Sequence, residues 1–508
     1  MQPFHRPALL HTHAPCLTVM LNHVQLITYI DRLGGGGIAE LNALLHGKLA
    51  GLFGGVHLLP FFTPIDGADA GFDPSDHASV DPRLGGWQHI SELAADTEVV
   101  ADLIVNHISR LSAQFQDYLQ HGSASPWAGL FLTRATVFGV ETNNDAVQAI
   151  YRPRPGLPFS KTTLGSGESV ELWTTFTPEQ IDIDVRHPLG QQYLDNILHT
   201  FAANGINMVR LDAVGYAIKQ AGTRCFMLPA TFDYIAALSA RVHALGMEVL
   251  VEIHSHYRKQ VEIATLVDWV YDFALPPLVL HAFAFCTAKP LQHWLQIRPV
   301  NALTVLDTHD GIGVIDIGGD GNEPGLVPPA ELDALVEIMH RNSHGQSREA
   351  TGAAASNLDL YQVNCTYYDA LGRSDRHYLM ARALQFFVPG IPQVYYVGLL
   401  AGENDMQLLQ RSGVGRDINR HYYQGGEVEA ALQSPVVKRL CALIRLRNSH
   451  PAFNGTFSMP VCTDTALTLR WDLGADSAEL YVDFGNDSCL LRLCEAGELR
   501  ELDIEAVQ

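Results

Sequence analysis

The chain has 508 residues, of which 47% are apolar and 17% charged, proportions typical of a soluble globular enzyme. Its 55 acidic and 33 basic side chains give a formal net charge of -22. This charge argues against nucleic acid or an anionic membrane surface as a partner. The length allows a large core and more than one structural unit.

Residues 1–19 precede the first recognisable pattern, which begins at Met20. They contain no sustained apolar core and do not resemble a secretion signal, so we expect a disordered N-terminal extension. No later apolar run reaches the roughly 18 residues that a membrane-spanning helix needs. We therefore expect a cytoplasmic protein. The eight cysteines are scattered without CxxC spacing, which favours free thiols over disulfides or a zinc site.

Strand-like apolar runs alternate with helical segments along most of the chain, which predicts an α/β fold with a (β/α)8 barrel. Segments such as LDNILHTFAA and FDYIAALSARVHAL have apolar spacings of three and four and are expected to be helices. The eight expected strands are 24–30, 55–62, 99–107, 205–212, 247–254, 269–276, 303–310 and 392–398. The barrel is expected to comprise residues 20–107, 187–310 and 373–452.

Two gaps between the expected strands are too long for simple crossovers. Residues 108–186 mix turns and strands, and residues 311–372 are rich in Gly, Asn and Ala. Long insertions at the C-terminal rim of a barrel usually shape its site. From residue 453 to 508 short alternating strands predict a small antiparallel β domain that closes the chain.

Four apolar runs end in polar residues that suit work on a sugar ring. They are Asn106-His107, Arg210-Leu211-Asp212, Glu252-Ile253-His254 and His309-Asp310. The C-terminal ends of barrel strands are where this fold carries its active site. Three acids placed there, one beside Arg and two beside His, indicate chemistry at a glycosidic bond.

Each acid has a role that its neighbours favour. Arg210 and Asp212 lie two residues apart and point to one face, so the guanidinium keeps the carboxylate ionised, as a nucleophile requires. Glu252 in a partly apolar pocket suits a general acid and then a base. Asp310 is expected to stabilise positive charge at the anomeric carbon. Taken singly, Arg210 and Asp212 could equally be a structural ion pair, and His254 a hydrogen-bonded core histidine.

Further side chains at neighbouring strand ends would complete a cup for one hexose. Asp69 and His107 supply polar groups, and Phe72 and Phe176 supply apolar faces. The expected reaction is a double displacement: Asp212 attacks while Glu252 protonates the leaving oxygen, and an acceptor then removes the sugar with retention. These roles require no metal or other cofactor, and the His spacing differs from that of a HExxH metal site.

Motifs at the strand ends carry a family resemblance. The segments DLIVNH, MVRLDAVGY, LVEIH and LDTHD resemble the four short regions typical of the α-amylase family, glycoside hydrolase family 13. Further segments, QLITYIDRLG, LLPFFTPIDGADAGFDP, YRPRPGLPF, TGAAASNLDLYQVN and GRDINRHYY, are similar to the sucrose-cleaving phosphorylases of that family. The resemblance spans about residues 22–460. It implies reversible transfer of glucosyl from sucrose to phosphate, giving α-D-glucose 1-phosphate and fructose, by a cytoplasmic and often homodimeric enzyme.

The resemblance also implies roles for individual residues. Asp212 would be the nucleophile, Glu252 the acid/base and Asp310 the transition-state stabiliser. The glucosyl unit would be held by Asp69, His107, Arg210, His309 and Arg416. The acceptor side would be lined by Pro153, Arg154, Tyr216, His254, Asp359, Leu360, Tyr361 and Gln362. Residues 108–186 would form domain B, and residues 311–372 domain B′.

A phosphate acceptor needs fixed positive donors in a protein of this charge, and Arg154, His254 and Arg416 are candidates. Arg154 could instead form a salt bridge within domain B, and Tyr361 and Gln362 could be local packing. The segment EIHSHY departs from the family by placing His256 where an aromatic residue is expected.

Three alternatives remain open. A related phosphorylase would use sucrose 6-phosphate, glucosylglycerol or glucosylglycerate. An amylase-like hydrolase or transglucosidase would use water or a sugar as acceptor. A non-catalytic carbohydrate-binding barrel would usually lose one of the three acids.

Overall fold

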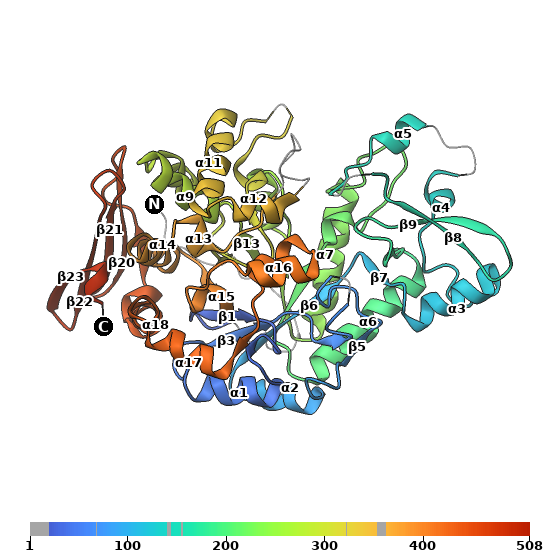
Figure 1. The fold of residues 1–508 in the computed structure, drawn as a ribbon, viewed down its shortest axis with the longest axis horizontal. Helices are drawn as coiled ribbons and strands as arrows, with labels where there is room; N and C mark the ends of the chain where they lie inside the picture. The colour runs from blue at the N-terminus through green and yellow to red at the C-terminus, as the bar shows by residue number, and fades with distance from the viewer. Residues whose placement is uncertain are drawn as a thin grey trace.

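A computed structural model describes residues 20–67, 69–139, 144–153, 156–321, 323–352 and 362–507. The disordered extension expected for residues 1–19 lies outside these ranges. Figure 1 shows a central barrel, with an antiparallel sheet on one side and an insertion rich in short elements on the other.

Eight parallel strands close the barrel, and each predicted strand corresponds to one of them. Every strand pairs in parallel with its neighbours, and β17 returns to pair with β1. The strands are β1 Gln25–Thr28, β3 Gly55–Leu58, β6 Glu98–Ile104, β11 Met208–Asp212, β12 Glu248–Val251, β13 Trp269–Asp272, β14 Ala302–Thr304 and β17 Ile391–Tyr395. The (β/α)8 fold class is therefore confirmed.

Several strands end before the prediction placed their ends. The range 247–254 shrinks to Glu248–Val251, and the range 303–310 to Ala302–Thr304. In both cases the polar residues of the motif follow the last paired residue. The chain leaves the sheet there, so the strict alternation of side chains between the two faces of a strand no longer applies to them.

Amphipathic helices wrap the barrel as expected. Helix α6, Pro188–Ala203, begins with proline after His187, whose Nδ1 accepts a hydrogen bond from the backbone N–H of Leu189 at 3.2 Å. Its buried residues Leu194, Ile197, Leu198 and Phe201 recur at helical spacing and cover the sheet. The other covering helices include α1 Ile38–His46, α2 Trp87–Leu93, α7 Pro229–Ala244, α8 Tyr257–Ile263, α9 Leu275–Phe285, α10 Lys289–Ile297, α14 Asp375–Phe387 and α18 Pro435–Ser449.

The first insertion leaves the barrel after β6 and carries two small antiparallel sheets. One pairs β8 Phe159–Thr163 with β9 Ser169–Trp173, and the other pairs β7 His107–Ser109 with β10 Gln180–Asp182. Helices α3 Ala113–His121, α4 Arg134–Phe138 and α5 Asn144–Gln148 complete it. Trp173 is buried in a cluster of its own with Leu132, Val147, Ile150 and Cys225. Such a separate cluster supports the proposed domain B.

The second insertion follows β14 and lies over the same rim. It begins with β15 Ile312–Gly313 and the short helix η3 Ile315–Ile317, and it continues through α11 Pro329–Asn342 and α12 Gln346–Thr351. Strand β16 Gln362–Val363 then pairs antiparallel with β15, before α13 Tyr367–Ala370. The limits of domains B and B′ remain a proposal.

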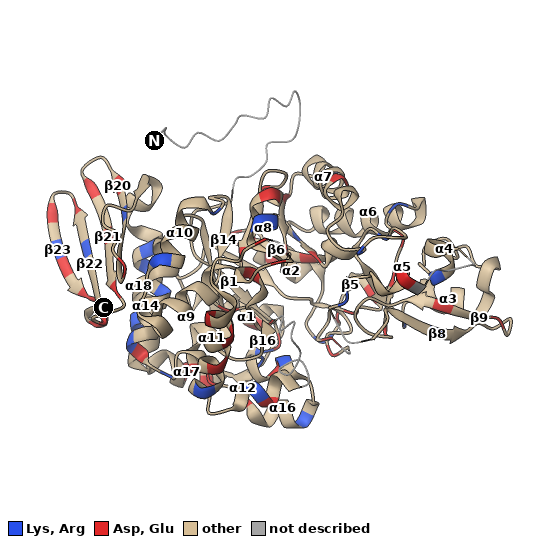
Figure 2. Ribbon diagram, turned by 90° about the horizontal axis from the view of Figure 1, so that it is seen from above, with Lys and Arg blue, Asp and Glu red and all other residues tan. Residues whose placement is uncertain are grey.

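A five-stranded antiparallel sheet closes the chain, as predicted. Its strands, β19 Thr456–Ser458, β20 Ala466–Leu473, β21 Asp476–Asp483, β22 Ser488–Glu495 and β23 Glu498–Asp503, pair in chain order. Figure 2 places this sheet beside α14 and α18. Trp471 donates from Nε1 to the carbonyl of Phe387 at 2.7 Å, and Arg376 pairs with Asp503 and Glu505 at 2.9 Å. These contacts join the sheet to the barrel.

Two further expectations concern cysteines and membranes. The cysteines within the described ranges, namely Cys225, Cys286, Cys365, Cys441, Cys462, Cys489 and Cys494, are free thiols, as predicted. In the part of the chain that the structure describes, no helix combines the length and the apolar character needed to cross a membrane.

Candidate active site

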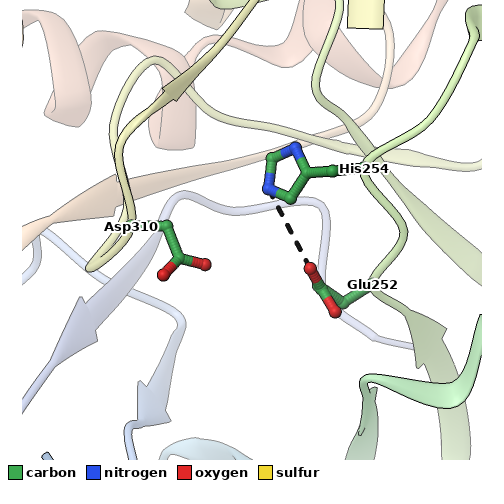
Figure 3. A group of neighbouring side chains, drawn as sticks. All are labelled: Glu252, His254 and Asp310. Atoms are coloured by element: carbon green, nitrogen blue, oxygen red, sulfur yellow. Dashed lines mark ion pairs between the residues drawn. The ribbon is translucent and has the colours of Figure 1, made fainter. Parts of the chain in front are cut away.

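The predicted acids converge at the C-terminal end of the barrel. Asp212 is the last residue of β11, Glu252 follows β12 directly, and Asp310 lies in the loop after β14. One nitrogen of His254 and one carboxylate oxygen from each of Glu252 and Asp310 lie within 4.8 Å of one another. Figure 3 shows Glu252 and His254 facing each other, with the Asp310 carboxylate directed into the same space.

A buried arginine orients Asp212. Nη1 of Arg210 lies 2.9 Å from Oδ1 of Asp212 and donates also to Asp102, its partner in the register of β11 and β6. Burial alone would raise the pKa of Asp102, but Arg210 and His57 hold it at about 2. Asp102 thus remains ionised and fixes the guanidinium. Asp102 is not among the predicted site residues, although an isolated acid inside the apolar run ADLIV is a signal for such a buried ion pair.

Asp212 and Glu252 form a closely interacting pair. The backbone N–H of Ala213 donates to Oε2 of Glu252 at 3.3 Å, which holds that side chain beside the end of β11. Burial and the neighbouring Glu252 raise the pKa of Asp212, and Arg210 opposes them. The ion pair to Arg210 is the contact that favours the anion at Asp212.

Asp310 has the opposite electrostatic environment. Burial would raise the pKa of this carboxyl group, but Arg416, His309 and His254 hold it well below its ordinary value. Nη1 of Arg416, from the short helix η5 Gly415–Asn419, lies 2.8 Å from Oδ1 of Asp310. Asp310 is therefore a permanent anion facing the other two acids.

The residues predicted to form the cup lie close together. The ring of His309 stacks on Phe72 at 4.8 Å, and burial lowers its pKa to about 3, so it is neutral. His107 lies 2.9 Å from the carbonyl of Phe72, and Nε2 of Gln180 lies 3.1 Å from His107. The same Gln180 nitrogen donates to Oδ2 of Asp69 at 3.2 Å. Gln180 thus connects Asp69 to His107. This residue is not among the predicted site residues, because it lies in the first insertion, far from both in the chain.

Aromatic rings extend the cup towards the first insertion. Phe176 contacts His107 at 5.5 Å and Tyr216 at 5.1 Å between ring centroids. Tyr216, in the short helix η2 Val214–Tyr216, stacks on Tyr151 at 6.2 Å. Pro153, two residues after Tyr151, is half-buried. These contacts bring Phe176, Tyr216 and the segment before Arg154 to one side of the acids.

The acceptor-side predictions fall partly outside the described residues. Arg154, Asp359, Leu360 and Tyr361 lie in the undescribed ranges. Gln362 is described: it is buried in β16 and pairs with Gly313 of β15. That pairing places it beside the loop that carries Asp316.

His254 is held at one ring face and at one nitrogen. Its ring stacks on Phe273 at 3.8 Å, and its Nδ1 lies 2.8 Å from Oδ2 of the buried Asp316. Nε2 faces Oε1 of Glu252 at 3.9 Å. Burial lowers the pKa of His254, but Asp316 and then Glu252 raise it above its ordinary value overall. The contacts with Asp316 and Glu252 therefore favour the charged imidazolium form of His254.

His256, the departure from the family pattern, does not face the acids. Its Nε2 lies 3.0 Å from the carbonyl of Pro324, and its ring packs against Tyr257 at 4.5 Å. The residue therefore anchors the second insertion.

Within the described residues, the group of Glu252, His254 and Asp310 is compact enough to surround a cation. The Nδ1 atom of His254 is already occupied by Asp316, and a charged imidazolium repels a metal ion. The same arrangement suits a sugar whose anomeric carbon becomes positive during reaction.

Residues 51–226 match the catalytic domain of α-amylase. The barrel and its acids thus define a member of the α-amylase family. Over 92% of its length, the chain is 59% identical to a sucrose phosphorylase of Agrobacterium vitis, 96% of which is covered. It is 54% identical to a sucrose phosphorylase of Bifidobacterium adolescentis, over 89% of this chain and 90% of that protein. The chain therefore belongs to the sucrose phosphorylase family.

A solved structure agrees with this assignment. The sucrose 6F-phosphate phosphorylase of Thermoanaerobacter thermosaccharolyticum superposes with a TM-score of 0.88, at 37% identity, over 96% of this chain and 98% of that one.

Proposed function

We propose that the protein is a sucrose phosphorylase, which converts sucrose and phosphate reversibly into α-D-glucose 1-phosphate and D-fructose. The observation that carries the proposal is the pairing of Asp212 with Arg210 beside Glu252 at two neighbouring strand ends. The identity of 59% to a sucrose phosphorylase supports this donor.

The first half-reaction transfers glucosyl to the enzyme. A carboxylate oxygen of Asp212 attacks the anomeric carbon, and the bond from that carbon to the fructosyl oxygen breaks. The electron pair goes to the fructosyl oxygen, which takes the proton from Glu252. The Arg210 guanidinium, 2.9 Å from Asp212, favours the anion of this nucleophile, and Glu252 acts as the general acid.

The second half-reaction releases glucose 1-phosphate. An oxygen of hydrogen phosphate attacks the anomeric carbon, and Asp212 departs as a carboxylate. The proton of hydrogen phosphate passes to Glu252, which restores the starting state. Two inversions give net retention of configuration.

The surrounding side chains form the donor site that binds the glucosyl unit. Asp310 stabilises the positive anomeric carbon, because Arg416 keeps this carboxylate ionised. The neutral His309 and His107 offer hydrogen bonds to ring hydroxyls together with Asp69, and Phe72 and Phe176 supply apolar faces.

The acceptor side comprises His254, Tyr216, Pro153 and Gln362, and we include Arg154, Asp359, Leu360 and Tyr361 from the sequence. The enzyme requires no cofactor for these steps. We further propose that it is cytoplasmic, possesses neither a nucleic-acid nor a membrane partner, and assembles as a homodimer.

Initial rates with different glucosyl donors test the function. Sucrose with inorganic phosphate should release glucose 1-phosphate faster than sucrose 6-phosphate, glucosylglycerol or glucosylglycerate does. A faster rate with one of those three donors would assign a related phosphorylase. Glucose release from starch or maltose without phosphate, in the absence of glucose 1-phosphate formation from sucrose, would refute phosphorolysis altogether.

A further inference from the structure

A buried carboxylate outside the group of three acids controls His254. Asp316 lies in η3 and is fully buried. Its Oδ2 accepts from Nδ1 of His254 at 2.8 Å, and its Oδ1 accepts from the backbone N–H of Ser255 at 3.2 Å and from Nε2 of Gln260 at 2.9 Å. Because both oxygens are engaged, the carboxylate cannot rotate away from the ring.

The fold leaves room for this contact at one glycine. A Cβ on Gly313 would lie 2.2 Å from Oδ2 of Asp316 and 2.9 Å from Nδ1 of His254. One face of the ring is covered by Phe273 at 3.8 Å. The imidazole is therefore clamped between a ring and a carboxylate, with Nε2 directed at Glu252.

Within the described ranges, three acids face His254. Asp316 lies at Nδ1, Glu252 lies 3.9 Å from Nε2, and Asp310 lies within 4.8 Å across the site. Asp316 is the group in direct contact, and the contact requires that Nδ1 carry a proton, since a carboxylate only accepts. In the imidazolium Nε2 also carries a proton, and this nitrogen faces Oε1 of Glu252 at 3.9 Å.

We propose that Asp316 is a positioning residue that keeps His254 charged and thereby makes phosphate, and not water, the preferred acceptor of the glucosyl group. This inference rests on the proposed function and names the group that selects its acceptor. When fructose has left, Glu252 has lost its proton and Asp310 is also anionic. Hydrogen phosphate must approach these two negative charges, whereas water is neutral and meets no such repulsion.

The imidazolium cancels one of those charges at contact distance. Its Nε2 lies 3.9 Å from Oε1 of Glu252, so its charge acts where the acceptor enters. Loss of that charge weakens the approach of phosphate as the acceptor far more than the approach of water. Asp316 touches His254 and not the reacting atoms, so it acts through His254 alone.

The decisive measurement is the partition of the glucosyl-enzyme. With sucrose as donor and varied inorganic phosphate, the ratio of glucose 1-phosphate to glucose reports the acceptor preference. Asp316→Asn should lower this ratio by roughly tenfold or more, from the Coulomb energy of one charge at contact. The ratio should also fall at a lower pH than in the wild type, because His254 loses its proton more readily.

A charge-matched control separates this effect from the overall charge. Asp320 is four residues further along, is half-exposed and pairs loosely with Arg224 at 3.6 Å. Asp320→Asn removes the same charge and should leave the ratio unchanged. A milder variant, Gln260→Ala, removes one bond to Oδ1 of Asp316 and should move the ratio in the same direction by a smaller factor.

An unchanged ratio in Asp316→Asn, or in Gln260→Ala if the first variant does not fold, would overturn the proposal. An equal fall of glucose 1-phosphate and glucose formation is one such case and indicates a structural role. Failure of the proposed function looks different, because the wild type itself would then form no glucose 1-phosphate from sucrose and phosphate.

Discussion

Both ends of the barrel bury carboxyl groups, but their surroundings differ. At the N-terminal end, Glu98 and Glu248 are the first residues of β6 and β12. Glu248 accepts from Nε1 of Trp269, and Glu98 accepts from the backbone N–H of Leu21 at 2.9 Å. At the C-terminal end, Asp212 and Asp310 each contact an arginine at less than 3 Å.

The consequence is a difference in charge state. Burial, aided by Glu248, raises the pKa of Glu98 to about 7, so this group tends to be neutral. Arg416 keeps Asp310 ionised in spite of its burial. A buried acid is thus not by itself a sign of catalysis. At the C-terminal end Arg416 holds the charge on Asp310, and Arg210 opposes the rise in pKa that burial and Glu252 impose on Asp212.

The strongest test of the comparison is Asp212→Asn. Loss of the nucleophile should lower turnover by roughly 10⁴-fold or more, while sucrose still binds. Turnover should be measured as fructose release, and binding by calorimetry with sucrose. Unaffected turnover would exclude Asp212 as nucleophile.

Not every buried charge at the C-terminal end is expected to be catalytic. Lys219 pairs with Asp182 of β10 at 2.7 Å and with Oδ1 of Asn106 at 2.8 Å, so it joins the first insertion to the barrel. Lys219→Met leaves Asp182 buried without its cation and should lower the free energy of unfolding by about 3–5 kcal/mol.

Urea unfolding measures this loss. The double variant Lys219→Met with Asp182→Asn removes both charges and should recover part of the stability. Equal stability of the wild type and the single variant would contradict a structural role for the pair.

A third test concerns pH. Arg416→Ala removes the cation that depresses the pKa of Asp310, so that pKa rises and the carboxylate is protonated on acidification at a higher pH. The acid limb of kcat/KM should therefore move to higher pH. At neutral pH kcat/KM should fall roughly tenfold to a hundredfold, as expected for a hydrogen bond between charged groups.

The matched control is Arg411→Ala, because Arg411 is an exposed arginine in the last turn of α16 Met406–Ser412. Its pH profile should match that of the wild type. An acid limb that does not move in Arg416→Ala would contradict the assigned role of Arg416.

The smallest effect on activity is expected at the other end of the barrel. The folded pKa of Glu98, about 7, exceeds its ordinary value of 4.5. Its contribution to stability is therefore present below about pH 4.5 and is lost as the pH rises through about 7. Glu98→Gln cannot ionise, so its Tm relative to the wild type should rise between pH 5 and pH 8, with kcat/KM unchanged. A Tm difference independent of pH would refute the assigned protonation state.

The strand ends were predictable because each polar motif directly follows an apolar run, and because parallel strands in a barrel end on one rim. Asp212, Glu252 and Asp310 are brought together there as expected. The strand lengths were overestimated, since apolar residues such as Leu306 continue past the last hydrogen-bonded pair of β14. An apolar pattern indicates burial, and the residues of a buried loop show the same pattern as those of a strand.

Partners across the fold could not be predicted in this way. Asp102 meets Arg210 through the register of two strands that are 108 residues apart in the chain. Gln180 reaches His107 from the end of an insertion, and Asp316 reaches His254 through a turn that requires Gly313. None of these pairs has a local spacing that would mark it in the sequence.

The sequence by itself thus determined the barrel, the order of its strands and the three acids at their ends. These follow from local periodicity and from the rule that parallel strands share one direction. The tertiary structure alone decided which charges face which acids, namely Arg210 at Asp212, Arg416 at Asp310 and Asp316 at His254. Charge states in a buried site depend on distances of a few ångströms, and such distances are set by packing between segments that are remote in the chain.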